Sequence, residues 1–433
     1  LVLFIICTRK QWHVVTPRKV WMYYVVESML MLVTIYFVVI GIRGGFGKYT
    51  RPITISNAMQ YTNTPQETAI LLNTPFSLMK SLENTTYVHP HYFSEEEAEL
   101  LFSPIHIDEI EENGRLGKVN VVVLILESFS KEYIGFYNQH IDGYKGYTPF
   151  LDSLLAQSVT YTHSFASGRK SIDAMPSVLS SIPMLIEPYI VTPYSTNAVS
   201  SLAACLKEEG YATAFFHGAP NGSMGFQAYA RSAGFEQYLG MDEYDGIEAF
   251  DGTWAIWDEE FLQYYARSMS QMQQPFMTAV FTASSHHPFR VPKQYEDVFP
   301  KGTQPSHQCI GYSDHALRAF FAYAKQQDWY ENTLFVITAD HTNQVSIPEY
   351  ATAKGLFEVP IAFYSPRWNQ GNLHNHGAVS QTDIMPSVLA YLGYSKPFFA
   401  FGENVLTQDK KHPYAVGYNH PVYQLLSDSL LLQ

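Results

Sequence analysis

The sequence predicts an α/β protein with a mainly parallel central sheet, covered by helices on both faces and preceded by a transmembrane helix. Three observations support this fold class. Continuous apolar runs of strand length alternate with amphipathic stretches from Lys118 onward, as in a sheet buried on both faces. Polar residues directly follow several of these runs. Finally, one apolar stretch near the start is long enough to cross a bilayer, and 433 residues suffice for a large domain plus such an extra segment.

Residues 1–42 form the predicted membrane segment. The run between Val20 and Ile42 is almost entirely apolar, and a hydrocarbon core of about 30 Å needs about 20 such residues in a helix. The opening LVLFII resembles the end of a preceding span. Between the two lies a short basic loop, which the positive-inside rule assigns to the cytoplasm, so that everything after Ile42 is expected outside. Its charges are Arg9, Lys10, Arg18 and Lys19.

Residues 43–117 read as a juxtamembrane helical linker, with short helices divided by proline and without recognisable chemistry. Residues 118–433 form the predicted main domain, and the abrupt end at SDSLLLQ suggests that further residues follow. Its expected strands are 119–126, 212–216, 276–283, 334–339, 359–365 and 414–418. Expected helices include 148–157, 201–210 and 313–327.

Composition excludes two classes of site. The net charge is −13, and no basic cluster follows the membrane loop, so nucleic acid is not an expected partner. Three widely separated cysteines provide neither a disulfide framework nor a CxxC metal site. No feature of the sequence predicts an oligomeric state.

Polar side chains follow four of the predicted strands. They are Glu127, His217, the run Ser285-His286-His287, and the pair Asp340-His341. In open α/β sheets the ligand crevice lies outside the carboxyl ends of the strands, so these distant residues are expected to converge. Glu127, Asp340 and His341 supply ligands that suit Mn, Mg or Zn and leave a coordination position open. Taken singly, Glu127 could cap a helix and the Asp-His pair could form a turn.

Ser171 is the candidate nucleophile. It follows FASGRK and precedes an apolar-periodic stretch, so it falls where a helix begins, and a helix N-terminus stabilises a phosphate. A bound metal ion would lower the pKa of the Ser171 hydroxyl. The alternative is a capping serine. Lys170 could offset the charge of the transferred group or be solvated.

The histidines are candidate substrate contacts. His286 and His217 could donate to a leaving oxygen or contact a phosphate, and His287 is a further candidate for substrate binding. Each could instead be structural. Asp258, in DGTWAIWDEEF, is expected to start a helix.

Together these residues resemble the alkaline phosphatase and sulfatase superfamily, and within it the membrane-anchored lipoteichoic acid synthase-like branch. The resemblance covers roughly residues 118–420. Its motifs are ESFS from Glu127, TPFLDSLLAQSVTYTHSFASG from Thr148, GRKSID from Gly168, FFHG from Phe215, SSHHPF from Ser284, WYENTLFVITADHT from Trp329, VPIAFYSP from Val359 and QTDIMPSVLAYLG from Gln381.

The resemblance implies an alkaline phosphatase-like sandwich and an outward-facing catalytic domain. It also implies one divalent metal, usually manganese, with Mg or Zn as alternatives. The family's metal ligands and nucleophile fall on Glu127, Ser171, Asp340 and His341, and its substrate-contacting histidines fall on His217 and His286.

Three departures stand out. Ser171 replaces the threonine nucleophile of lipoteichoic acid synthases. The tryptophan and arginine that bind glycerol phosphate in those enzymes fall on Met224 and Phe226. Neither Ser167 nor Ser171 begins the C/S-x-P-x-R motif of true sulfatases.

The implied function is phosphotransfer at the outer face of a bacterial cytoplasmic membrane. A phosphoglycerol or phosphoethanolamine headgroup would pass from a phospholipid to a hydroxyl of a glycan or lipid acceptor, through a phosphoseryl intermediate. The alternative is a sulfatase or phosphodiesterase that hydrolyses small esters. A non-catalytic membrane protein that uses the fold for recognition is a third interpretation.

Overall fold

The computed structural model describes residues 19–43, 46, 58–59, 61–62, 65–82, 91–107, 116–368, 371–375, 377–407, 410–419 and 421–433. The chain divides into two compact units, Leu1–Thr54 and Ile55–Gln433. Helix α2 (Val20–Arg43) belongs to the first unit, and none of its residues is buried. Within the described ranges, α2 is the one helix long and apolar enough to cross a membrane, judged by length and composition. The predicted preceding span and the basic residues Arg9, Lys10 and Arg18 lie outside the described residues.

The second unit is built on an eight-stranded sheet with the order β10-β3-β9-β8-β2-β7-β5-β6. Its strands are β2 (Asn120–Leu126), β3 (Val159–Tyr161), β5 (Ala212–His217), β6 (Gln237–Leu239), β7 (Phe276–Phe281), β8 (Thr333–Ala339), β9 (Ile361–Tyr364) and β10 (Asn372–His374). All pairs are parallel except those that β9 makes with β3 and β8. The predicted mainly parallel sheet is therefore confirmed.

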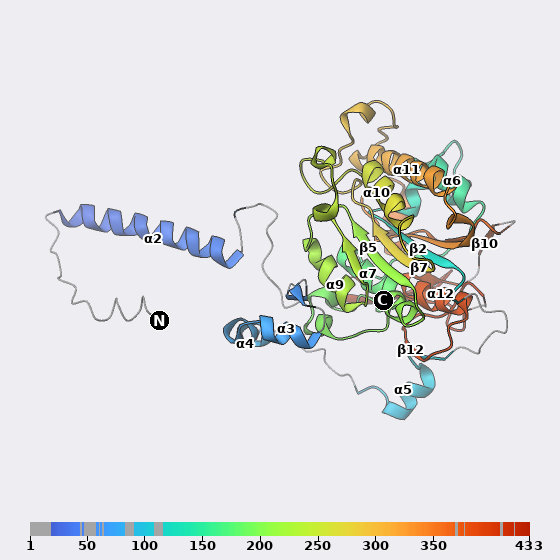
Figure 1. The fold of residues 1–433 in the computed structure, drawn as a ribbon, viewed down its shortest axis with the longest axis horizontal. Coiled ribbons are helices and arrows are strands. Elements are labelled where there is room, and N and C mark those ends of the chain that lie inside the picture. Colours follow the sequence, from blue (N-terminus) through green and yellow to red (C-terminus); the bar gives the residue numbers. More distant parts are fainter. Residues whose placement is uncertain are drawn as a thin grey trace. The chain divides into compact units, whose positions relative to one another are not determined.

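Helices cover both faces of this sheet (Figure 1). Alternate residues of β2 point to opposite faces, so Val121 and Val123 join one core and Val122 and Leu124 the other. The first core includes residues of α7 (Ser171–Ser180), α8 (Leu202–Lys207), α9 (Phe226–Ser232) and α12 (Ile384–Leu392). The second includes residues of α6 (Pro149–Leu155), α10 (Asp258–Met269) and α11 (Pro305–Ala324).

Smaller elements surround these layers. Helices α3 (Pro65–Leu71), α4 (Thr74–Leu82) and α5 (Glu95–Leu101) precede the sheet, and β1 (Ile105–His106) pairs with β12 (Phe398–Phe399). A short parallel pair joins β4 (Ser164–Phe165) to β11 (Val379–Ser380).

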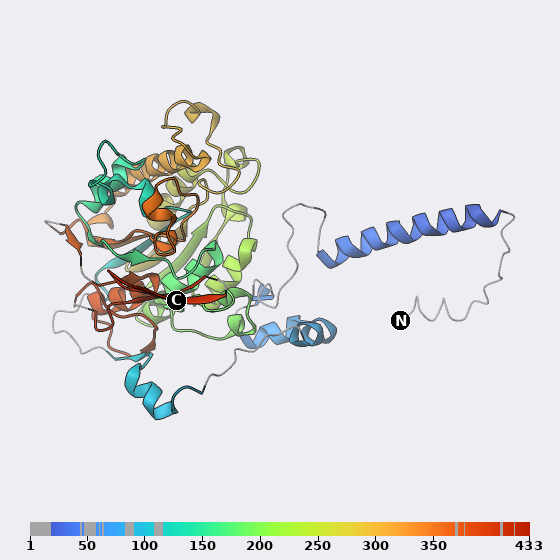
Figure 2. The same cartoon turned by 180° about the vertical axis from the view of Figure 1, so that it is seen from behind.

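The predicted strand at 414–418 is confirmed, but it lies outside the central sheet. It forms β13 (Ala415–Asn419), which belongs to a separate antiparallel sheet with β14 (Val422–Leu426) and β15 (Leu431–Leu432), coloured red in Figure 2. An apolar pattern predicts that a segment is extended and not which sheet it joins, because its partners lie elsewhere in the chain. Helix α11 also begins eight residues before the predicted 313, at Pro305.

Candidate active site

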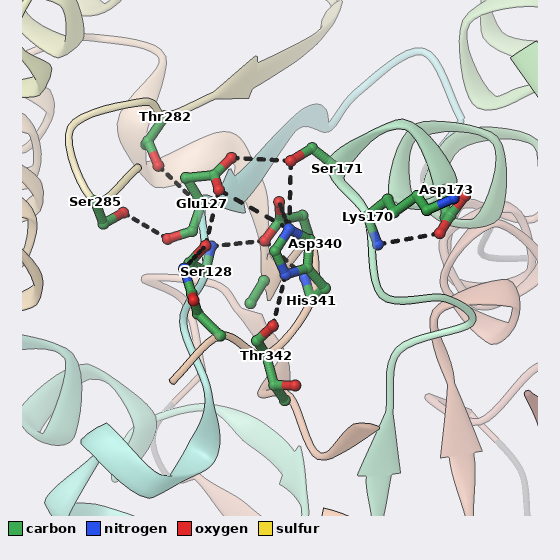
Figure 3. A network of polar contacts seen from close by, with 12 residues as sticks. Glu127, Ser128, Lys170, Ser171, Asp173, Thr282, Ser285, Asp340, His341 and Thr342 are labelled. Atoms are coloured by element: carbon green, nitrogen blue, oxygen red, sulfur yellow. Dashed lines mark hydrogen bonds and ion pairs between the residues drawn. The ribbon is translucent and has the colours of Figure 1, made fainter. Parts of the chain in front are cut away.

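Two neighbouring strands bring the first acidic residues together. β2 and β8 are parallel, and their register pairs Leu126 with Ala339. The next residues, Glu127 and Asp340, therefore leave the sheet side by side, and the Asp340 amide donates to the Leu126 carbonyl at 3.0 Å. His341 follows immediately. These three side chains therefore gather at the carboxyl ends of the strands, which is the sheet edge that the sequence predicts (Figure 3).

Glu127, Asp340 and His341 can hold a metal ion. One ligand atom from each lies within 4.8 Å of the others. His341 Nε2 is 3.1 Å from Asp340 Oδ2 and 3.9 Å from Glu127 Oε1. His341 Nδ1 lies 2.7 Å from the Thr342 carbonyl oxygen, which requires Nδ1 to carry the proton. In the neutral ring Nε2 then has a lone pair directed at the carboxylates, as a metal ligand needs.

The electrostatics of the three groups also fit a cation. Burial raises the pKa of Asp340, and the nearby charge of Glu127 raises it further. Asp340 Oδ1 accepts hydrogen bonds from the Ser128 and His341 amides, whereas the buried Oδ2 accepts none. Although burial lowers the pKa of His341, the charges of Asp340 and Glu127 raise it overall. Two buried carboxylates, of which Asp340 has an oxygen that accepts no hydrogen bond, form a donor set suited to a divalent ion.

Ser171 lies beside this cluster. Its Oγ donates to Glu127 Oε2 at 3.2 Å and is 3.4 Å from His341 Nε2, and the side chain is almost buried. It is the first residue of α7, and Lys170 is the N-cap, so Ser171 does not cap the helix. The Lys170 amide instead donates to Asp173 at 3.1 Å. The hydroxyl is therefore available at the start of a ten-residue helix, where helical N–H groups favour an anion.

His217 ends β5 in a buried position. Its Nδ1 donates to the Phe281 carbonyl oxygen at 3.0 Å, and its buried Nε2 has no hydrogen-bond partner. Burial lowers its pKa to about 4. His217 is therefore uncharged near neutral pH, and its Nε2 can accept a hydrogen bond but cannot donate one.

The other predicted contacts differ in accessibility. His286 is partly buried, stacks on Trp254 and donates from Nδ1 to the His287 carbonyl oxygen at 2.7 Å. The His287 ring is exposed and packs edge-on against Phe289 at 5.7 Å between centroids. Lys170 is exposed.

Residues that orient Glu127 escaped the sequence analysis. The Glu127 amide donates to Thr282 Oγ1 at 2.9 Å, and Ser285 Oγ donates to the Glu127 carbonyl oxygen at 2.5 Å. Ser128 Oγ donates to Glu127 Oε1 at 2.8 Å. The sequence shows the serines and threonines in ESFS and FTASSHH, but only the sheet order reveals which groups of Glu127 they bind.

Gln381 links the metal-ligand strand to the serine loop. Its Nε2 donates to the carbonyl oxygens of Ala339 and Asp340, at 2.7 and 2.9 Å. Its Oε1 accepts the Ser167 amide at 2.9 Å. Gln381 is a polar residue at the start of the apolar run QTDIMPSVLAYLG, and this position is the sequence feature that could have identified the buried side chain.

Asp258 begins α10, as predicted, and also anchors a neighbouring loop. Its Oδ1 accepts the Ala283 and Ser284 amides at 2.8 and 3.1 Å, and the Asp258 amide donates to Ser284 Oγ. Ser313 Oγ donates to its other oxygen at 2.7 Å. The start of α10 and the loop that carries His286 are thus joined.

The residues at the headgroup-binding positions of the resemblance are apolar. Phe226 is fully buried, with its ring centroid 5.0 Å from that of His217. Met224 is partly buried and has a positive φ of 52°. Phe226 therefore presents no surface to a substrate.

Comparison with known proteins agrees with this architecture. The lipoteichoic acid synthase-like protein YvgJ of Bacillus subtilis is 24% identical over 319 residues, which cover 69% of this chain and 51% of that protein. The chain spans about half the length of the curated relatives it matches. The structure of lipoteichoic acid synthase LtaP from Listeria monocytogenes superposes with a TM-score of 0.65 at 21% identity, covering 75% of this chain and 85% of that one.

A second solved structure has the same fold. The alkaline phosphatase superfamily protein from Vibrio parahaemolyticus superposes with a TM-score of 0.64 at 23% identity, and covers 73% of this chain and 78% of that one. The alkaline phosphatase-like fold is therefore confirmed. The sulfatase family model matches residues 119–394, a span that contains all the residues of the metal-ligand cluster and the serine beside it. The chain belongs to the sulfatase family.

Proposed function

We propose that this protein is a membrane-anchored, metal-dependent phosphotransferase. It moves a phosphoalcohol headgroup, phosphoglycerol or phosphoethanolamine, from a phospholipid to an acceptor hydroxyl on a glycan or lipid. The observation that supports this most is the Ser171 hydroxyl, held 3.2 Å from Glu127 and 3.4 Å from His341 at the start of α7. The similarity to lipoteichoic acid synthases supports the choice of a lipid donor.

The metal ligands in this proposal are Glu127, Asp340 and His341, with Ser171 as the fourth protein ligand. A divalent ion, manganese by the family resemblance, would lower the pKa of the Ser171 hydroxyl and offset charge on the phosphate. Glu127 Oε2, which accepts the Ser171 hydrogen bond, orients the oxygen before it attacks. Lys170 and His287 are proposed to contact the anionic substrate from the exposed side of the site.

The reaction proceeds in two displacements. Ser171 Oγ passes its proton to Glu127 Oε2, which accepts its hydrogen bond, and attacks phosphorus, while the bond from phosphorus to the diacylglycerol oxygen breaks. His286, when protonated, donates from Nε2 to that oxygen, because its Nδ1 is engaged with the His287 carbonyl. The acceptor hydroxyl then attacks the phosphoserine and His286 Nε2 takes its proton, while the bond to Ser171 Oγ breaks and this oxygen recovers its proton from Glu127. His217 can only accept a hydrogen bond in its neutral form, so we assign it to a substrate hydroxyl rather than to the leaving oxygen.

The proposed location is the outer face of a bacterial cytoplasmic membrane. Helix α2 has the length and composition of a membrane span, and the basic residues that precede it in the sequence favour a cytoplasmic start. A phospholipid donor stays in the bilayer, so an anchored enzyme remains close to it.

The direct test uses the full chain in detergent with manganese and isotope-labelled phosphatidylglycerol or phosphatidylethanolamine. We expect release of diacylglycerol and a labelled adduct on Ser171, read by mass spectrometry. Ser171→Ala should lower turnover roughly a thousand-fold or more, whereas Ser171→Thr, which keeps a hydroxyl, should retain activity. Full turnover by Ser171→Ala would exclude this nucleophile. Faster hydrolysis of small nitrophenyl phosphate or sulfate esters than of lipids would favour a soluble-substrate hydrolase.

A further inference from the structure

Trp254 lies directly against His286. The indole and imidazole rings are stacked, with centroids 5.2 Å apart and planes inclined by 15°. The stacking covers one face of the imidazole, and the Nδ1 bond to the His287 carbonyl fixes its rotation. Of the two ring nitrogens of His286, Nε2 is then the one left to meet a substrate.

A tight turn holds Trp254 in place. Asp251 Oδ1 accepts the amides of Thr253, Trp254 and Ala255 at 2.6, 2.5 and 3.2 Å. Such a carboxylate turn fixes the backbone on both sides of the tryptophan. The backbone that carries the indole is therefore already fixed before a substrate binds.

The position of Trp254 connects the loops that carry the two histidines. The indole packs against three small residues, Ala219, Ala255 and Ala283, of which the first follows His217 and the last precedes His286. The Ile256 amide donates to the Gly218 carbonyl at 2.9 Å.

The same loop reaches the metal-ligand cluster. Ser285, next to His286, donates to the Glu127 carbonyl oxygen (Figure 3). Asp258, four residues after Trp254, binds the Ala283 and Ser284 amides. Hydrogen bonds therefore connect the loop that carries His286 to the backbone of Glu127 and to the start of α10, and Trp254 stacks on His286.

The rings that contact His217 offer no surface to a ligand. Phe226 and Phe281 both contact His217, and both are fully buried. Trp254 is only partly buried, and within the described part of the chain its Nε1–H has no hydrogen-bond partner. An aromatic edge with one free donor suits a small alcohol, whose carbons pack on the ring while a hydroxyl accepts from the indole.

We propose that Trp254 contacts the alcohol part of the phosphodiester and, together with His286, selects which headgroup reacts. This inference rests on the proposed phosphotransfer and adds a specificity-determining residue to it. The ligand class is a small polar alcohol esterified to phosphate.

The test compares Trp254→Leu and Trp254→Phe in the full-length chain in detergent with manganese. kcat and KM are measured for phosphatidylglycerol and phosphatidylethanolamine. We expect Trp254→Leu to lower kcat/KM for the preferred lipid about ten-fold and to change the ratio between the two lipids, and Trp254→Phe to restore most of both. The matched control is Trp257→Leu, because Trp257 packs edge-on against Tyr312, at 5.9 Å between centroids, and makes no ring contact with His286. It should leave the ratio unchanged.

A structural role would give a different result. Equal losses for both lipids, with no rescue by phenylalanine, would overturn the proposal, as would an unchanged ratio in Trp254→Leu. A second measurement distinguishes failure of the Trp254 proposal from failure of the proposed function. Glycerol phosphate and phosphoethanolamine are titrated into the manganese-loaded chain by calorimetry.

Wild type that turns over neither lipid would refute the proposed function, but the calorimetry still tests Trp254. Trp254→Leu should then weaken binding of one probe about ten-fold relative to the other. Equal weakening, no weakening, or no binding of either probe by wild type would overturn the proposal.

Discussion

Ser128 shows how closely the two carboxylates are controlled by backbone conformation. It has a φ of 59°, a left-handed conformation that costs a non-glycine residue roughly 1–2 kcal/mol. In this conformation its amide donates to Asp340 Oδ1 at 2.6 Å and its hydroxyl to Glu127 Oε1 at 2.8 Å. Asn343 Nδ2 in turn donates to the Ser128 hydroxyl at 3.1 Å. One residue thus orients ligands from two strands, which is a common function of strained positions.

Replacing this hydroxyl should weaken metal binding. We expect Ser128→Ala to reduce manganese affinity about 10- to 100-fold, the usual effect of losing a hydrogen bond that orients a metal ligand. Affinity is measured by competition with a fluorescent chelator. Ser130→Ala is the matched control, because Ser130 accepts from the Glu132 amide and does not touch the cluster. Equal affinities in wild type and Ser128→Ala would show that this hydrogen bond does not support the metal site.

At this scale, sequence reasoning identified side chains but not their partners. Glu127, Asp340 and His341 were predictable because each follows a buried strand of clear apolar pattern. Ser128 and Gln381 were not, because their function depends on backbone groups brought near by folding. A hydroxyl or amide in a loop has too many alternative partners for its sequence position to specify one.

Among the elements, length determined what could be predicted. The long, fully buried strands β2 and β8 and the helices α6, α7 and α8 lie where the apolar patterns placed them. β3, β6 and β10 have three residues each, which is too short for a periodic pattern, and the sequence did not reveal them. Strand order follows from contacts between distant segments, as β13 illustrates, because its strand pattern did not reveal that it joins a separate sheet.

Helices α6 and α11 meet through a buried carboxylate. Asp314, on α11, accepts the amides of Phe150 and Leu151 in the first turn of α6, at 2.9 and 2.8 Å. Burial raises its pKa from 3.8 to about 7; the two amides and Arg318 oppose this shift, and Asp152 adds to it. Between about pH 4 and pH 7, the Asp314 carboxyl group therefore keeps its proton in the folded protein and loses it in the unfolded chain.

This raised pKa predicts a pH dependence of stability. A raised folded pKa means that the contribution of Asp314 is fully present below about pH 4 and is lost as the pH rises to about 7. Asp314→Asn does not titrate. The free energy of unfolding of wild type minus that of Asp314→Asn should therefore fall between these pH values, as measured by urea denaturation of the full chain with a chelator present. Parallel pH curves for the two proteins would contradict the assignment.

For the whole molecule, an apolar N-terminal helix accompanies a catalytic domain of acidic composition. The predicted span from Val20 to Ile42 corresponds to α2, which ends one residue later at Arg43. Its apolar length was readable without tertiary information, because a bilayer imposes that length on any helix that crosses it. The headgroup and the acceptor depend instead on the shape of a site assembled from several loops, which no single stretch of sequence encodes.

The stability of the domain should also depend on metal. Glu127 and Asp340 extend from adjacent central strands and are both buried, so their mutual repulsion acts on the core of the sheet. A divalent ion that binds only the folded chain stabilises it by about 2.7 kcal/mol at a hundred times its Kd. For a domain of this size we expect manganese to raise Tm by roughly 3 to 5 °C, read by circular dichroism after chelator treatment.

The Asp340→Asn variant distinguishes this effect from nonspecific stabilisation by salt. It removes one ligand and also the carboxyl group whose ionisation burial and the Glu127 charge oppose, while its amide oxygen can still accept from Ser128 and His341. Without metal it should therefore melt at a higher temperature than wild type, and manganese should leave its Tm unchanged. A wild-type Tm that does not respond to manganese, or an equal response in Asp340→Asn, would mean that the ion does not bind between these strands.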